Sequence, residues 1–251
     1  MNYITLTEEN IDKEHICCAL VDKKGYCGAA KKKDWLKQQI REGLVFRKAE
    51  IRGKVFIEYL PAEKAWVPVQ ADNYLFINCL WVWGSYKGKG YGRELLQSCI
   101  DDAKAQGKYG VVGLSSVKKK GFLSDPGFFK KYGFEVADTA EPYYQLYYLK
   151  VDENAPVPSF KECAKKGTIE DKEHVVVYYT NQCPFTEDNV REVKEAAEKN
   201  GIPFRAVKYE TAEMAQNAPV PSTTFSLFRD GKFVTHEVQN VSKFMKLMGL
   251  K

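Results

Sequence analysis

Glycines alternate with basic and aromatic side chains over residues 82–93, which read Val-Trp-Gly-Ser-Tyr-Lys-Gly-Lys-Gly-Tyr-Gly-Arg. Glycines let the backbone approach an anion closely, and the two lysines and the arginine add cationic donors. The apolar stretch Tyr74–Val82 ahead of them predicts a strand buried on both faces, and Glu94–Gln106 predicts an amphipathic helix. The first N–H groups of a helix lack intrahelical partners and favour negative charge. These residues therefore predict a phosphate cradle where the strand meets the helix.

The spacing within Lys87–Gly92 separates this cradle from two common ones. The P-loop needs a closing Gly-Lys-Ser/Thr, and the dinucleotide fingerprint needs G-x-G-x-x-G, whereas here the glycines alternate. The segment resembles the Q/R-x-x-G-x-G/A pyrophosphate loop of the GNAT acetyltransferases, with Lys87 in place of Arg or Gln. A second segment, Phe128–Glu135, resembles the FY-x-x-x-GF block of the same family. The alternative is an ordinary glycine turn between a core strand and a helix.

The resemblance implies that acetyl-CoA is the co-substrate. Loop residues would bind its pyrophosphate, and main-chain groups of the preceding strand would bind its pantetheine and thioester. The expected cofactor-binding residues are Leu80, Trp81, Val82, Lys87, Gly88, Lys89, Gly90, Tyr91, Gly92 and Arg93.

The resemblance also implies direct attack of an amine on the thioester, which calls for a general base and a general acid. Many family members carry Asp or Glu on the fourth strand, where this chain has Asn78 and Cys79. Glu58 on the preceding strand is the nearest candidate base, the alternative being an exposed strand residue. The tyrosine of the FY block is Phe129 here, so Tyr132 becomes the candidate acid, unless it only packs the end of its helix.

Composition places the chain among ordinary globular proteins. It has 251 residues, 44% of them hydrophobic and 28% charged, with a net charge of +5. The short clusters Lys31–Lys33 and Lys118–Lys120 are expected to be solvated surface rather than nucleic-acid arms. No apolar run approaches the roughly 20 residues of a membrane span. The seven cysteines form no CxxC pair and no zinc-finger spacing with the three histidines, so we expect a reducing cytoplasm and no metal site.

The order of predicted elements divides the chain. Residues 1–150 read β-α-α-β-β-β-α-β-α-β-β, with the first helices at Glu8–Leu20 and Lys31–Glu42. This is the order of the GNAT fold, an α/β (α+β) domain whose mixed central sheet carries helices on both faces. Residues 151–173, rich in turn and proline signals, are expected to be an exposed linker.

Residues 174–251 read β-α-β-α-β-β-α and resemble the thioredoxin/glutaredoxin fold. Cys183 matches the first cysteine of that family's C-x-x-C, Thr186 stands at the second, and Pro221 matches the family's cis proline. Cys183 lies just before the predicted helix Glu187–Lys199, so its sulfur should face the first-turn N–H groups, which would lower its pKa. Together the two halves resemble the bacterial GNAT proteins with a YoaP-like C-terminal domain.

Three functions remain open at this point. The first is a cytoplasmic N-acetyltransferase that acts on an unidentified small-molecule or peptide amine. The second is a thiol-redox or sensor protein, in which Cys183 reacts as a monothiol with a low-molecular-weight thiol such as glutathione or bacillithiol while the front domain turns over poorly. The third is a binding module for an acylated ligand. For the tail itself, the alternative to thiol chemistry at Cys183 is a thioredoxin-like domain that binds a partner or shapes the acceptor site.

Overall fold

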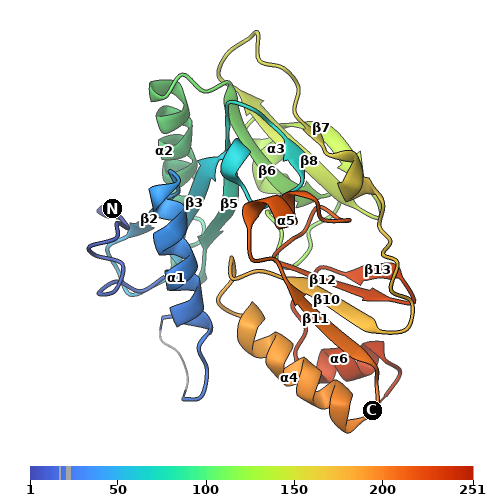
Figure 1. The fold of residues 1–251 in the computed structure, drawn as a ribbon. Helices are drawn as coiled ribbons and strands as arrows, with labels where there is room; N and C mark the ends of the chain where they lie inside the picture. The colour runs from blue at the N-terminus through green and yellow to red at the C-terminus, as the bar shows by residue number, and fades with distance from the viewer. Residues whose placement is uncertain (17, 21–23, 251) are drawn as a thin grey trace.

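The computed structural model describes residues 1–16, 18–20 and 24–250, and in this part the chain forms two mixed sheets (Figure 1). The larger sheet has the strand order β1-β2-β3-β5-β6-β8-β7. Its strands are β1 (Tyr3–Thr5), β2 (Val45–Ala49), β3 (Val55–Pro61), β5 (Tyr74–Val82), β6 (Gly110–Ser116), β7 (Glu135–Ala140) and β8 (Tyr144–Lys150). Neighbours run antiparallel except β5 and β6, which are parallel. The predicted mixed central sheet is confirmed.

Helices cover both faces of this sheet because its strands alternate apolar side chains between two cores. On β3, Phe56 and Leu60 pack in the same core as α1 (Gly28–Arg41). Ile57 and Tyr59, which lie between these two residues and point to the opposite face, pack instead with α2 (Tyr91–Ala105) and α3 (Pro126–Lys131). This period of two buries both faces of the strand.

The predicted helix Glu8–Leu20 is wrong. Apart from Cys17, which lies outside the described residues, this segment consists of turns and bends. The side chain of Asn10 accepts a hydrogen bond from the Thr7 amide at 2.8 Å and donates to the Thr5 carbonyl at 3.0 Å. Such side-chain bonds give the backbone an alternative to the helical ladder, which explains the missing helix.

The C-terminal part of the chain forms the second sheet, in the order β11-β10-β12-β13. Its strands are β10 (Val175–Tyr179), β11 (Phe204–Lys208), β12 (Phe225–Arg229) and β13 (Lys232–Thr235). β10 and β11 are parallel, and the other pairs are antiparallel. α4 (Thr186–Lys199) and α6 (Val241–Leu247) share an apolar core with one face of this sheet, and α5 (Ala212–Gln216) follows β11. The cis peptide bond of the described chain precedes Pro142 and not Pro221, so the expected cis bond before Pro221 is wrong; nothing here overrides the ordinary trans preference.

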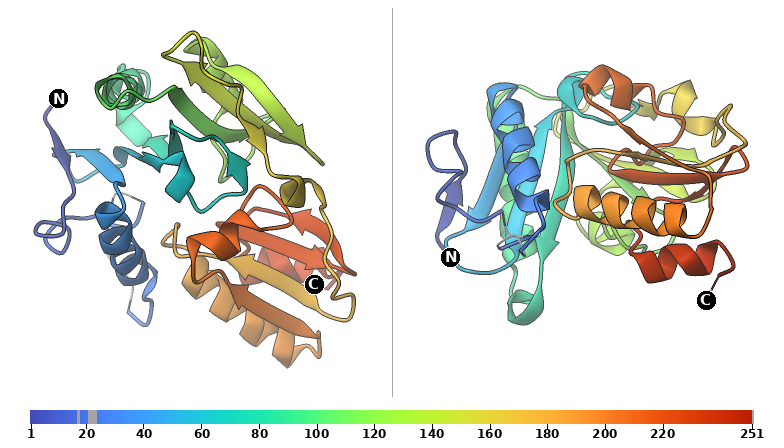
Figure 2. Two further views of the ribbon diagram at one scale, coloured as in Figure 1. Left: turned by 45° about the horizontal axis from the view of Figure 1, so that its top comes forward. Right: turned by 60° about the horizontal axis from the view of Figure 1, so that its bottom comes forward.

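The other face of the small sheet packs against the large one. Val176, Val220 and Phe228 belong to the same apolar core as Trp66 and Leu146. Figure 2 shows the C-terminal domain lying against the sheet on the side of α1. One apolar core is therefore shared by both halves of the chain.

The segment between the domains takes part in this packing. Ala155, Phe160 and Ala164 are buried, and the short strand β9 (Ser159–Phe160) pairs with β4 (Val69–Gln70). The expectation that residues 151–173 form an exposed linker is wrong for these side chains, because each of them fills part of the shared core. The domain boundaries themselves stay a prediction.

Candidate active site

β5 and β6 separate halfway along their length. Their pairing covers Tyr74–Ile77 against Gly110–Gly113 and then stops, although both strands continue. Beyond that point β5 pairs only with β3 on its other side. In the described part of the chain no strand covers the β6-facing edge of residues 78–82, so the main-chain groups of Leu80, Trp81 and Val82 that point toward this edge have no strand partner there.

A run of free amides follows β5. Gly90 is the N-cap residue of α2, with a φ of +87°, and Gly88 has a φ of +75°. Among the described residues, no group accepts a hydrogen bond from the amides of residues 88–92. A Cβ added at Gly88 or Gly90 would meet nothing within 4 Å. Several unpaired donors therefore surround open space at a helix N-terminus, an arrangement that fits a pyrophosphate.

Cations flank this amide run. Lys87, Lys89 and Arg93 are exposed, and none of them forms an ion pair with a carboxylate of the described residues. The Lys87 ammonium lies 4.2 Å from the ring centre of Trp83, which is 52% exposed. These charges are therefore free to bind an anion.

Gly92 and Phe129 contribute to the packing of α3 against the neighbouring elements. A Cβ at Gly92 would lie 3.2 Å from the ring of Phe128, and one at Gly113 would lie 2.6 Å from the ring of Phe129. Phe129 itself is buried. The glycines thus let α3 approach the rest of the site.

Tyr132 ends α3 and packs with the α2 core. Its ring centre lies 4.8 Å from that of Phe128, and it is partly buried. No described group bonds its hydroxyl, which leaves the proton free for another partner. The phenol therefore keeps the chemistry that a general acid requires.

Glu58 is the second candidate, and it is not exposed. Its carboxylate is bonded by the ammonium of Lys32 at 2.7 and 2.9 Å and by the amide nitrogen of Asn78 at 3.1 Å. Glu58 is 1% exposed and Lys32 is 3% exposed. The alternative of an exposed strand residue is wrong, because α1 covers this part of β3.

Lys32 was expected to be surface, and it is the residue that the sequence reasoning missed. The signal was its spacing: Lys32, Trp35, Leu36 and Gln39 share one helical stripe, and all four are buried. Glu58 thus faces α1, whereas Tyr132 packs on the α2 side of the same sheet. Only a ligand that reaches both faces of the sheet would contact both residues.

Cys183 lies close to this ion pair. Burial raises the pKa of its thiol to about 12, and the Phe185 N–H and the charge of Lys32 offset this only in part. The predicted lowering of the pKa is therefore wrong, because loss of water outweighs the favourable contacts at the helix N-terminus. Thr186, at the second cysteine position, donates its hydroxyl to the Thr180 and Cys183 carbonyls at 2.6 and 2.8 Å.

The C-terminal domain also caps α1. Oδ2 of Asp188 accepts from the amides of Gly28 at 2.8 Å and Cys27 at 3.1 Å. A Cβ at Gly28 would lie 1.9 Å from the carbonyl oxygen of Pro184, so only glycine fits this contact. The N-terminal ends of α1 and α4 consequently meet, as Figure 1 shows.

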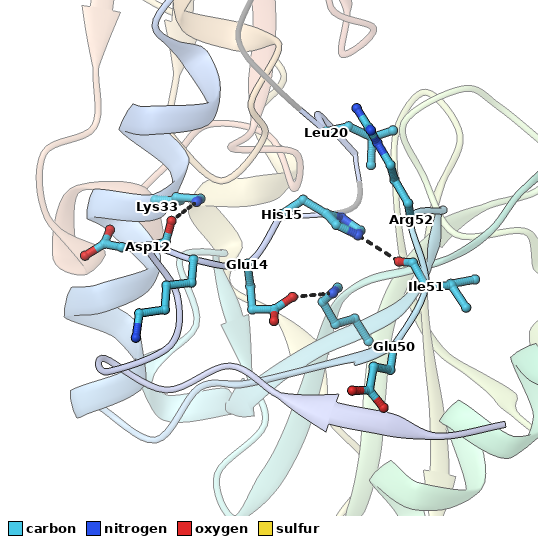
Figure 3. A pocket seen from close by; sticks show the side chains of 10 residues that line it. Asp12, Glu14, His15, Leu20, Lys33, Glu50, Ile51 and Arg52 are labelled. Atoms are coloured by element: carbon cyan, nitrogen blue, oxygen red, sulfur yellow. Dashed lines mark hydrogen bonds and ion pairs between the residues drawn. The ribbon is translucent and has the colours of Figure 1, made fainter.

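A separate cavity of about 520 Å³ opens between the N-terminal segment and β2, away from the predicted site residues. Figure 3 shows its charged lining, in which Glu14 binds Lys48 and a ring nitrogen of His15 contacts the Ile51 carbonyl. The described residues hold no cluster of three metal-ligating side chains and no helix long and apolar enough to cross a bilayer.

Known sequences resemble both halves of the chain. Residues 11–134 match the acetyltransferase (GNAT) family, and residues 203–246 match the YoaP-like family. The uncharacterized N-acetyltransferase YoaP of Bacillus subtilis (strain 168) is 46% identical over 248 residues, covering 99% of this chain and 98% of that protein.

Solved structures resemble the front part. The PaiA N-acetyltransferase of Thermoplasma acidophilum, solved with coenzyme A, has a TM-score of 0.41 and 19% identity over 60% of this chain and 99% of its own. A GNAT-family acetyltransferase of Staphylococcus aureus Mu50 has a TM-score of 0.42 and 16% identity over 60% of this chain and 99% of its own.

Proposed function

The chain belongs to the GNAT acetyltransferase family, with a YoaP-like C-terminal domain and acetyl-CoA as its acetyl donor, and on this premise we propose that it acetylates a small-molecule or peptide amine. The observation that carries the proposal is the run of unbonded amides at residues 88–92, at the end of a strand whose edge is free. Such a site holds a phosphorylated donor in one orientation, which is the main requirement for direct transfer between two bound reactants.

In this proposal the loop binds the pyrophosphate and β5 orients the thioester. The amides of Gly88–Gly92 and the charges of Lys87, Lys89 and Arg93 would hold the phosphates. The free edge at Leu80, Trp81 and Val82 would hold the pantetheine by main-chain bonds. The donor supplies an activated acetyl group, and side chains of this chain would transfer the protons.

Two side chains are proposed to handle protons. Glu58, held by Lys32 and Asn78, would accept the proton of the attacking amine, directly or through water. Tyr132, whose hydroxyl is unbonded among the described residues, would supply a proton to the departing thiolate. Glu58 and Tyr132 lie on opposite sides of the sheet, which suits one residue that acts on the attacking amine and another that acts on the departing thiolate.

The tail is proposed to be thioredoxin-like, since its elements β10, α4, β11, α5, β12, β13 and α6 follow one another in the order on which the resemblance was based. Its redox chemistry has no structural support. The pKa of Cys183 is raised, and the hydroxyl of Thr186 is bonded to backbone. The cysteines that the structure describes are free, in keeping with a proposed cytoplasmic location.

A matched pair of substitutions tests the CoA site. Gly90→Glu places a carboxylate in the cradle, and Gly107→Glu places one at the opposite end of the same helix. Both glycines have positive φ, +87° and +63°, with no atom within 4 Å of an added Cβ, so the backbone strain is similar. Calorimetric titration with CoA should show at least a tenfold loss, about 1.4 kcal/mol, for Gly90→Glu alone. Equal affinity in both folded variants would contradict the site.

Turnover is tested by thiol release from acetyl-CoA with a panel of polyamines, aminoglycosides, amino acids and short peptides. We expect release that depends on one class of amine, with the acetylated product identified by mass spectrometry. Tight CoA binding without acetylation of any amine would favour the binding-module alternative.

A further inference from the structure

Lys32 is bonded to both domains at once. Its ammonium donates to the two oxygens of Glu58, at 2.9 and 2.7 Å, and to the carbonyl of Gln182 at 2.6 Å. These three contacts use all three of its N–H donors. A buried charge is tolerated only while its partners stay in place. The position of the Glu58 carboxylate therefore depends on the segment that carries Gln182.

That segment, residues 180–184, is here called the tail loop, and it is rigidly held. The side-chain amide of Gln182 donates to the hydroxyls of Thr180 at 3.0 Å and Thr223 at 3.1 Å. The Thr186 hydroxyl bonds the carbonyls of Thr180 and Cys183. The loop thus presents the carbonyl of Gln182 in one fixed place.

The tail loop is also pressed against α1. A Cβ atom added at Gly28 would lie only 1.9 Å from the carbonyl oxygen of Pro184, so the two backbones are in direct contact. Asp188, in the first turn of α4, accepts hydrogen bonds from the amides at the start of α1. Any movement of the loop therefore moves either α1 or the partner of Lys32.

We propose that the C-terminal domain is a positioning element of the acetyltransferase site and that it acts through Lys32. The inference rests on the proposed function, in which Glu58 accepts the amine proton. The tail loop fixes Lys32, and Lys32 with Asn78 fixes the carboxylate. Loosening the loop lowers turnover and leaves the CoA loop intact, because residues 87–93 lie beyond the end of β5 and make none of these contacts.

Substitution of Lys32 is the first test, made in the full-length chain with acetyl-CoA and the amine that the wild type acetylates fastest. Lys32→Met keeps the apolar stem and removes the charge, and we expect at least a tenfold fall in kcat with the affinity for CoA unchanged within twofold. Lys32→Arg should recover part of kcat. The control Lys37→Met lies on the same helix and pairs with the exposed Asp12, and it should match the wild type.

A wedge variant tests the role of the domain without changing a charge. Gly28→Ala forces the tail loop away from α1 and should lower kcat as Lys32→Met does. Gly121→Ala is the control, since its Cβ would lie 3.7 Å from Glu237 of the C-terminal domain, an ordinary contact. Asp188→Asn is a milder loosening for use where Gly28→Ala does not fold.

Alkylation of Cys183, followed by mass spectrometry, needs no acceptor and keeps the two proposals separable. Loosening the loop should expose this thiol further and speed its labelling at least tenfold in Gly28→Ala, but not in Gly121→Ala. Lys32→Met is left out of this measurement, because it also removes a charge that lowers the pKa of the thiol. A folded Gly28→Ala variant with unchanged labelling, or folded Lys32→Met and Gly28→Ala variants with kcat within twofold of the wild type, would overturn the inference. A wild type that acetylates no amine would contradict the proposed function alone, and the labelling rates would still decide whether the contact with α1 holds the tail loop in place.

Discussion

Cys183 shows that position at a helix start does not by itself make a thiol reactive. The N–H groups there stabilise a thiolate, but only a residue that also keeps contact with water or a strong cation gains from them. Here burial dominates and raises the pKa to about 12. The thiolate is the reactive form, so we expect the thiol of Cys183 to react slowly near neutral pH.

We predict slow alkylation of Cys183 in the wild-type chain. At pH 7.5 its rate with iodoacetamide should be at least about a hundredfold below that of glutathione, because far less of it is ionised. Below the pKa the rate should rise about tenfold per pH unit, since the thiolate fraction does so. Peptide mapping, with Cys183→Ser to identify the peptide, gives the rates. Labelling of Cys183 as fast as glutathione would revive the redox alternative.

Residue chemistry was predictable where its causes lay nearby in the sequence. The glycines at 88 and 90 take the positive φ values that a tight loop requires, and their amides stay unbonded. The burial of Glu58 depends instead on its ion pair with Lys32. The raised pKa of Cys183 depends on how closely the tail loop packs. Those contacts join segments far apart in the chain, and no local pattern records them.

Secondary structure elements were likewise predictable where the causes are local and regular, and were mispredicted where side-chain hydrogen bonds or contacts with the other domain decide. β5 and the helix after it were readable from hydrophobic pattern and glycine stops, and β5 has the predicted bounds. The segment at residues 8–20 has a helical stripe, yet Asn10 ties it into turns. α1 begins at Gly28, earlier than predicted, because the cap of its first turn comes from the other domain.

That borrowed cap leads to a prediction for α1. Its N-cap residue, Cys27, makes no side-chain cap bond, and Asp188 supplies the acceptor instead. Asp188→Ala should lower the free energy of unfolding by about 1–2 kcal/mol, the usual cost of losing a cap. Urea unfolding followed by circular dichroism measures this, with Asp12→Ala as the exposed control. A loss no larger than that of the control would show that the cap is not needed.

At the scale of the whole molecule, the two sheets share one apolar core. The core shared by Trp66, Leu146 and Phe228 has contributions from both sides of the predicted boundary. The domain boundaries drawn from composition stay a prediction, and composition does not reveal whether one sheet can fold without the other. Burial of residues 155, 160 and 164 argues that it cannot.

A fragment of residues 1–150 tests this. We expect it to bind a hydrophobic dye and to unfold without a sharp transition, because its α1-side face loses its cover. The full-length chain should unfold in one cooperative step in the same buffer. Calorimetry and dye fluorescence distinguish the two, and a fragment that melts cooperatively and binds CoA as tightly as the full chain would show that the front domain is independent.

The close contact between Gly28 and the Pro184 carbonyl limits which substitutions this chain can accept during evolution. Any side chain at position 28 collides with the carbonyl at position 184, so a mutation there survives only if the loop shifts as well. A recombination event that joined this tail to another front domain would lose this fit unless that domain had a glycine at the corresponding position. The two halves are therefore expected to be inherited and exchanged as a pair.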